Sequence, residues 1–196
     1  MSRKIITISR EFGSGGRFIG EEVSKKLGIA YYDKDIIAKV AKKSGLDSKF
    51  IEQRGEYSAT KSIFAYGLIA RNSDGSSIED YIYRFQRDLI LELAEKEPCV
   101  IIGRCADFIL RERKDCVNFF LFGNEKEKTE RIMRLYELSE TDAKKLMKDT
   151  DKKRSNNYNY YTDQKWGNMK NYTLSMNTSE IGYDACVDII CDLYHR

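Results

Sequence analysis

The chain contains little histidine and little net charge, and each shortage argues against a class of function. Its one histidine, His195, is the next-to-last of 196 residues. A general base must be held rigidly against its partner, so a Ser-His or Cys-His mechanism is not expected. The 34 basic and 31 acidic residues leave a formal net charge of +3, well below the basic excess of a general nucleic-acid-binding protein. Any anion site must therefore arise from local placement of charge.

The sequence also lacks paired cysteines, a secretory signal and long apolar runs. Its five cysteines form no CxxC pair and stand mostly in apolar stretches: Cys99, Cys105, Cys116, Cys186 and Cys191. No apolar run approaches the roughly 20 residues needed to cross a membrane. We therefore expect reduced structural thiols in a cytoplasmic protein with no membrane partner. The length fits one domain over residues 1–196, with a core that needs neither metals nor disulfides.

The pattern of apolar residues predicts an α/β fold. Residues 4–9 have the composition of a buried strand. The apolar residues after them recur at helical intervals, and Gly28 is expected to end that helix. Two continuous apolar runs, CVIIG and CVNFFLFG, are typical of strands covered on both faces. Helical patterns occupy residues 76–97, 124–138 and 139–154, and a last strand and helix lie within 171–194. Strands separated by helices predict a parallel sheet with helices on both faces.

The stretch FGSGGRF, residues 12–18, is called here the glycine loop. It lies between the first strand and the first helix, where doubly wound sheets bind phosphates. The usual phosphate loop, GxxxxGK[ST], uses a lysine and a hydroxyl, but here one register places Gly16 and Arg17 at these two positions. The other register places Arg17 and Phe18 there, so a purely structural glycine turn stays open as an alternative. A cation at the start of a helix is unfavourable unless an anion binds there, and so Arg17 favours a phosphate site.

The sequence as a set of motifs resembles the cytidylate kinase-like family of bacteria, within the nucleoside monophosphate kinases. The resemblance rests on SREFGSGGR, YYDKDII, IIGRCADFIL, DKKR and YTLSMNTSEIGYDACVDII, and it spans the chain from Ile5 to about Leu193. It implies a P-loop fold with a five-stranded parallel sheet, a helical substrate-side insertion over about 33–97 and a lid over about 151–169. It further implies a phosphotransferase that uses ATP and Mg²⁺, with a nucleoside monophosphate such as CMP as the acceptor.

The resemblance also implies roles for individual residues. The donor ATP would bind the glycine loop, through Phe12, Gly13, Ser14, Gly15, Gly16, Arg17 and Phe18. Asp33 and Arg104 would face the acceptor, and Arg104 would grip its phosphate. Arg17, Arg104, Asp151 and Arg154 would form the catalytic set, with Arg154 neutralising the phosphoryl group in transit. No residue is assigned as a metal ligand.

Several of these residues also have a second interpretation. Asp33 could simply cap a helix, and Arg154 stands in a charge run of the kind that often faces solvent. Asp35 and Asp107 could be linked to magnesium, although helix-face positions explain them as well. The aromatic cluster of Tyr158, Tyr160, Tyr161 and Trp166 could stack bases, but packing within the lid is the more economical interpretation.

The chain departs from the usual cytidylate kinase pattern at two places. The loop lacks GKS, and Cys105 rather than aspartate follows the GR of IIGR. Two alternatives to cytidylate kinase activity therefore stay open. One is a nucleotide-binding regulatory protein that has lost catalysis, and the other is a P-loop kinase for a different small metabolite.

Overall fold

The computed structural model describes residues 4–33, 36 and 77–196. Five parallel strands form one sheet in the order β2-β3-β1-β4-β5. The strands are β1 (Ile5–Arg10), β2 (Ala30–Tyr32), β3 (Cys99–Ile102), β4 (Cys116–Phe122) and β5 (Leu174–Asn177). The α/β fold with a five-stranded parallel sheet is thus confirmed, and the two continuous apolar runs are β3 and β4, as predicted.

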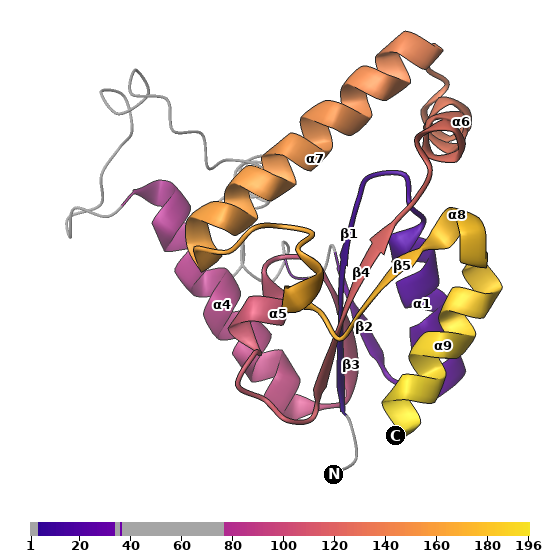
Figure 1. Cartoon of the computed structure of the whole chain (residues 1–196). Coiled ribbons are helices and arrows are strands. Elements are labelled where there is room, and N and C mark those ends of the chain that lie inside the picture. Colours follow the sequence, from indigo (N-terminus) through magenta and orange to yellow (C-terminus); the bar gives the residue numbers. More distant parts are fainter. Residues whose placement is uncertain (1–3, 34–35, 37–76) are drawn as a thin grey trace.

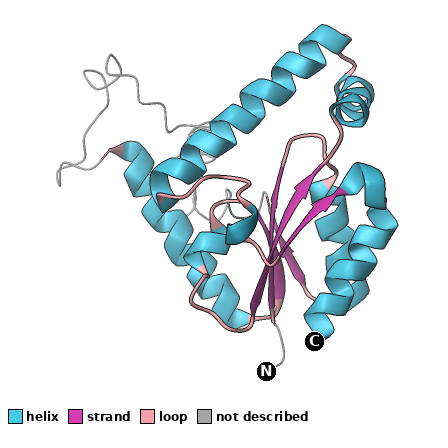
Figure 2. Cartoon of the chain, in the orientation of Figure 1, coloured by secondary structure: helices cyan, strands magenta, loops and turns pink. Residues whose placement is uncertain are grey.

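Helices cover both faces of this sheet (Figures 1 and 2). One face is packed by α1 (Gly16–Leu27) and α9 (Tyr183–His195), which contact each other, and the other by α4 (Ile78–Lys96) and α5 (Ala106–Ile109). The remaining helical elements are α6 (Glu125–Tyr136), α7 (Glu140–Thr162), α8 (Thr178–Ile181) and the 3-10 turn η2 (Met169–Asn171).

Alternation along the central strand explains the two layers. Ile5 of β1 joins the core under α4 and α5, whereas Ile6 and Ile8 join the core under α1 and α9. All three are fully buried. Successive side chains of a strand point to opposite faces, and every residue of β1 is buried, so this strand is covered by a helix layer on each side.

Helix α7 is longer than the sequence pattern predicts. The pattern ends near Arg154, but the helix continues through the tyrosine-rich stretch to Thr162. In Figure 1 it runs from α6 toward α4 at the end of the molecule where the strands finish. The ring of Tyr161 stacks on Tyr83 of α4, with centroids 3.9 Å apart and planes 6° apart, so tertiary contacts hold the last turns.

Some predictions fall outside the described residues. Most of the proposed insertion, including Asp35, lies in 34–35 and 37–76. The proposed lid over about 151–169 lies within the described residues, in α7 and the segment that follows it. The insertion, the lid and the single domain over 1–196 stay predictions. All five cysteines lie in the described part as buried thiols. No described helix is both long enough and apolar enough to span a membrane.

Candidate functional site

The glycine loop joins the carboxyl end of β1 to the first turn of α1. Gly13 and Gly15 have φ angles of +89° and +80°, values that side chains other than glycine rarely adopt. Gly15 is the N-cap of α1, and no side chain caps that helix end. The amide groups at the start of a 12-residue helix therefore stand at the loop, where they favour an anion.

A pocket opens over this loop, and it is called the loop pocket. Its wall includes the glycine loop except Ser14, and on the other side Arg131, Leu135 and Tyr136 of α6. Phe18 and Tyr136 are exposed, at 43% and 49%. The pocket thus combines backbone donors, cationic groups and aromatic faces, which suits a nucleotide with a phosphate chain.

A second, neighbouring pocket is called the arginine pocket. Its lining comes from the carboxyl ends of β1 and β3, from α7 and from the segment after it: Ser9, Arg10, Gly103, Arg104, Cys105, Arg154, Asn157, Tyr158 and Trp166. Arg10 and Arg154 line both pockets. These two arginines therefore stand at the junction between the pockets.

The three arginines of the arginine pocket are buried. Their exposed fractions are 4% for Arg10, 4% for Arg104 and 7% for Arg154. The Nη1 of Arg154 donates to the backbone oxygen of Arg10 at 3.1 Å, and the Arg154 guanidinium lies over the ring of Phe12. Three buried guanidinium groups at one place concentrate positive charge and hydrogen-bond donors, so this cluster is a candidate site for an anionic group.

Arg104 is held in an unusual backbone conformation. It follows β3 in the run Gly103, Arg104 and Cys105, whose φ angles are 65°, 60° and 55°. Its carbonyl oxygen accepts a hydrogen bond from Nε2 of Gln86, at 3.3 Å. Left-handed conformations at two successive non-glycine residues cost energy and are found preferentially at functional sites. Arg104 is thus a buried residue in a strained turn after β3, and its functional role stays a prediction.

Arg17 and Asp33 pair with each other. Nε of Arg17 lies 2.6 Å from Oδ2 of Asp33, the residue that follows β2. The Asp33 side chain is buried, whereas that of Arg17 is 45% exposed. The other carboxylate oxygen of Asp33 is buried without a hydrogen-bond partner among the described residues. The structure thus pairs Arg17, predicted to bind the donor nucleotide, with Asp33, predicted to face the acceptor substrate. This pair lies at the rim of the loop pocket.

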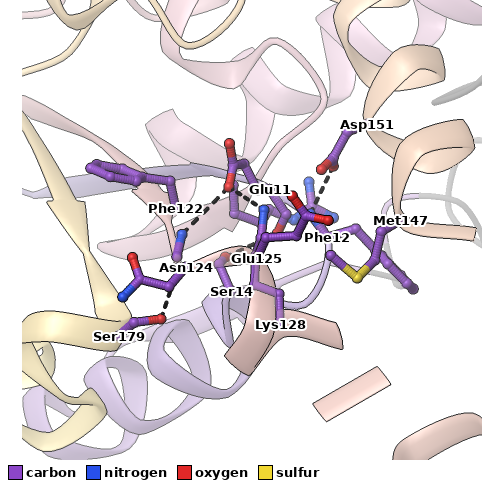
Figure 3. A network of polar contacts seen from close by, with 12 residues as sticks. Glu11, Phe12, Ser14, Phe122, Asn124, Glu125, Lys128, Met147, Asp151 and Ser179 are labelled. Carbon is purple, nitrogen blue, oxygen red and sulfur yellow. Dashed lines mark hydrogen bonds and ion pairs between the residues drawn. The ribbon is translucent and has the colours of Figure 1, made fainter. Parts of the chain in front are cut away.

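Asp151 ties α7 to the glycine loop. Its Oδ1 accepts a hydrogen bond from the backbone N–H of Phe12 at 2.7 Å (Figure 3). Burial raises the pKa of this carboxyl to about 6, against the lowering effects of the Phe12 hydrogen bond and of nearby Arg154. Figure 3 also shows Lys128 of α6 paired with Glu11 at 2.6 Å. Helix α7 is therefore anchored on the first residue of the glycine loop, and α6 on Glu11, the residue directly before it.

Asp107 lies beside the arginine pocket, buried to 3% exposure. The hydroxyl of Tyr158 donates to its Oδ2 at 2.7 Å, and Ser9 donates to its Oδ1 at 3.4 Å. Burial raises the pKa of Asp107 to about 6, and the Tyr158 hydrogen bond opposes this rise. The carboxyl is thus built into the wall between β1 and α7.

The structure brings most of the predicted site residues together. The predicted donor residues Phe12, Gly13, Gly15, Gly16, Arg17 and Phe18 line the loop pocket with Arg154, and Ser14 is buried at the back of the loop. Arg104 and Arg154 meet in the arginine pocket. Within residues 4–33, 36 and 77–196, no three His, Cys, Asp or Glu side chains form a cluster able to hold a metal ion.

Sequence reasoning missed Arg10 and Arg131. Arg10 is the last residue of β1 and directly precedes the glycine loop, and this position at a strand end was the available signal. Arg131 has no comparable signal, because it stands among many charges on α6. Its guanidinium lies over the ring of Tyr183, 5.1 Å from the centroid.

Comparison with known families agrees with this arrangement. The model of the cytidylate kinase-like family matches residues 5–180. The chain belongs to the cytidylate kinase-like family. A search of curated proteins returns no match for this cytidylate kinase-like chain.

Solved structures give the same picture of the fold. An uncharacterized protein from Eubacterium ventriosum is 27% identical, covers 98% of both chains and has a TM-score of 0.75. A shikimate kinase from Bacteroides thetaiotaomicron covers 96% of this chain and 97% of its own, at 14% identity and a TM-score of 0.55. A gluconokinase from Sinorhizobium meliloti covers 97% and 96%, at 15% identity and 0.51. The last two likenesses concern the fold alone, which is that of P-loop kinases.

Proposed function

We propose that this cytidylate kinase-like protein transfers the terminal phosphoryl group of ATP to a small anionic acceptor. The observation that carries the proposal is the pair of adjoining pockets that share Arg10 and Arg154. Phosphoryl transfer requires two substrates aligned around one charged group, with cations at that point and water excluded. CMP is the first candidate acceptor, since the family is named for cytidylate kinases, and the protein is proposed to act in the cytoplasm.

The loop pocket would hold the donor. The amide groups of the loop and of the α1 N-terminus face the phosphates, and the aromatic faces of Phe18 and Tyr136 with the guanidinium of Arg131 offer stacking contacts for a base. Arg17 adds a cation at the rim, where its pairing with Asp33 links donor and acceptor sides. The positive charge and the aromatic faces of these residues support ATP as the ligand of the loop pocket.

The arginine pocket would hold the acceptor. Arg104 binds its phosphate or carboxylate, which a guanidinium can do through two parallel hydrogen bonds. Arg154 neutralises the group in transit, and Asp151 positions α7 by its contact with the loop. Lid closure by residues 151–169 would exclude water from the junction.

Magnesium has no assigned protein ligand in this proposal. The family generally works with ATP and Mg²⁺, but Arg17 stands where the loop pattern places its hydroxyl. No step is therefore assigned to the metal.

The second candidate is a nucleotide-binding regulatory protein. It is favoured by one observation: neither a lysine nor a hydroxyl stands at the loop positions where the phosphate-loop pattern requires them. Such a protein would bind ATP without a magnesium requirement and would transfer no phosphate. A kinase for another small metabolite is the remaining alternative and differs only in the acceptor.

The test combines binding with an acceptor screen. Isothermal calorimetry of ATP, with and without Mg²⁺, is followed by a coupled assay across nucleoside monophosphates and small hydroxy acids. We expect micromolar ATP binding and turnover with at least one acceptor. Arg104→Met should abolish turnover and leave ATP affinity within about tenfold, while the half-exposed Arg111→Met, outside both pockets, serves as the matched control. ATP binding without turnover for any acceptor would support the regulatory alternative, and no ATP binding would end the donor-site proposal.

A further inference from the structure

The loop sequence shows an exchange of two residues when it is read against the phosphate-loop pattern. With Gly15 and Gly16 at the last glycine and the lysine of GxxxxGK, the first glycine of the pattern falls on Arg10. An arginine therefore stands where the pattern has glycine, and a glycine stands where it has lysine. The positive side chain has moved from one end of the loop to the other.

The structure explains why the two changes belong together. A Cβ added at Gly16 would lie 2.8 Å from Cβ and 2.9 Å from Cγ of Arg10. Real Cβ atoms do not approach other carbons this closely, so the Arg10 side chain passes over the position where a lysine side chain would leave the backbone. Arg10 thus excludes a lysine at position 16, and glycine there makes room for Arg10.

We propose that Arg10 replaces the missing loop lysine as the cation that binds the outer phosphates of the donor. It is one of the two arginines that line both pockets, and it is 4% exposed. This inference rests on the proposed function, because it assigns the charge that the phosphate chain would meet.

The backbone of Arg10 is held more firmly than that of an ordinary loop residue. Arg10 ends the central strand in register with Leu121 of β4, and its carbonyl accepts the hydrogen bond from Arg154. A guanidinium anchored in this way can bind two phosphate oxygens at once, whereas a lysine ammonium acts as a point charge. Arg17, by contrast, is half exposed and paired with Asp33, so it makes the smaller contribution to phosphate binding.

The first test compares arginine variants by the phosphate chain that they recognise. Calorimetry measures the affinities for ATP, ADP, AMP and inorganic tripolyphosphate in wild type, Arg10→Met, Arg10→Lys, Arg17→Met and Arg111→Met. Arg10→Met should lose about 10–100-fold in ATP affinity and most of the preference for ATP over AMP. Arg10→Lys should retain part of the ATP affinity and part of the preference for ATP over AMP. Arg17→Met should lose less ATP affinity than Arg10→Met, and Arg111→Met should bind ATP as the wild type does.

The second test restores the pattern. Gly16→Lys alone should bind ATP poorly, because its side chain meets Arg10. The double variant Arg10→Gly with Gly16→Lys removes that contact. It should recover ATP affinity to within about tenfold of wild type and should bind ATP more tightly than Arg10→Gly alone, which is measured beside it. Circular dichroism checks that each variant is folded. If Arg10→Met does not fold, the ATP affinities of Arg10→Lys and of the double variant test the role of Arg10 instead.

The outcomes separate the two proposals. Turnover and an ATP preference that survive in Arg10→Met would overturn the role of Arg10 and leave the kinase proposal standing, as would a double variant no better than Arg10→Gly alone. A wild type that binds tripolyphosphate through Arg10 but not ATP would retain the anion site and end the kinase proposal. A wild type that binds neither would end both.

Discussion

At the scale of single residues, Asp107 shows how burial and hydrogen bonding oppose each other. Its carboxyl is buried beside the arginine pocket, and this burial raises its pKa to about 6, while the Tyr158 hydrogen bond acts to lower it. A carboxyl with this pKa changes charge just below neutral pH. The charge at the wall of the arginine pocket therefore changes in a pH range where ordinary aspartates are already ionised.

The first prediction concerns the pH dependence of stability. The folded pKa of Asp107 lies above the ordinary value near 3.9, so the native state holds the proton more tightly than the unfolded chain. Its stabilising contribution is thus complete below about pH 4 and lost as the pH rises through about 6. Relative to Asp107→Asn, the wild-type free energy of unfolding should fall over this window by up to about 3 kcal/mol. Urea unfolding at a series of pH values measures the difference.

The comparison with Asp107→Asn isolates one group. Asp151 also has a raised pKa of about 6, but it titrates in both proteins and cancels in the difference. Tyr158→Phe removes the hydrogen bond that lowers the Asp107 pKa, so the loss of stability should extend to higher pH in that variant. Parallel pH profiles for wild type and Asp107→Asn would contradict the assigned pKa.

At the scale of elements, the glycine loop is restricted by both its backbone and its neighbours. Gly15 has a φ of +80°, and a Cβ there would lie 2.5 Å from the ring of Tyr183, the first residue of α9. Gly28 also has a positive φ, +66°, but a Cβ there would meet nothing within 4 Å. The two positions separate backbone strain from steric contact.

The second prediction compares alanine substitutions at Gly15 and Gly28. Gly28→Ala should lower the free energy of unfolding by about 1–2 kcal/mol, because only the left-handed backbone conformation is penalised there. Gly15→Ala carries the same penalty and must also displace Tyr183, so it should destabilise by at least about 1 kcal/mol more and should weaken ATP binding. Urea unfolding and calorimetry measure both effects. Equal stability losses for the two variants would show that Tyr183 moves aside without cost.

The elements differ in how far the sequence determines them. Strands β3 and β4 were predictable, because continuous apolar runs have few alternatives, and α4 was predictable from its spacing and from Ser77, whose side chain accepts from the N–H of Asp80. The last two turns of α7 were not. Their sequence is polar and aromatic without helical periodicity, and the contacts that stabilise them, Tyr158 with Asp107 and Tyr161 with Tyr83, are distant in sequence.

The candidate site also has features that the sequence predicts and contacts that it does not. The glycine loop was visible as a local pattern, and Arg104 was visible as an arginine that directly follows a buried strand. The pairing of Arg17 with Asp33 and the contact of Arg10 with Gly16 depend on the three-dimensional course of the side chains. Spacing along the chain carries no information on such contacts, so the role now proposed for Arg10 required the structure.

At the scale of the whole molecule, the strand order determines where the arginines meet. β1 lies between β3 and β4. Arg10 ends β1 and Arg104 follows the neighbouring parallel strand β3, so both lie at the same edge of the sheet. Arg154 reaches this edge from α7, more than 140 residues after Arg10. The position of α7 relative to the sheet therefore controls whether the proposed transfer site is complete.

The third prediction tests this control through Arg154. If Arg154 neutralises the phosphoryl group in transit, Arg154→Met should lower turnover about a thousandfold or more while ATP affinity stays within about tenfold. Such a split indicates an interaction made mainly in the transition state, because a purely structural role would weaken binding and turnover together. Arg154→Lys should recover part of the rate, and Lys148→Met, an exposed change on the same helix, should behave as wild type. Steady-state kinetics measures turnover and calorimetry measures ATP affinity. Equal losses in the two would contradict a role in the transition state and would show that Arg154 acts only by holding α7 on the sheet.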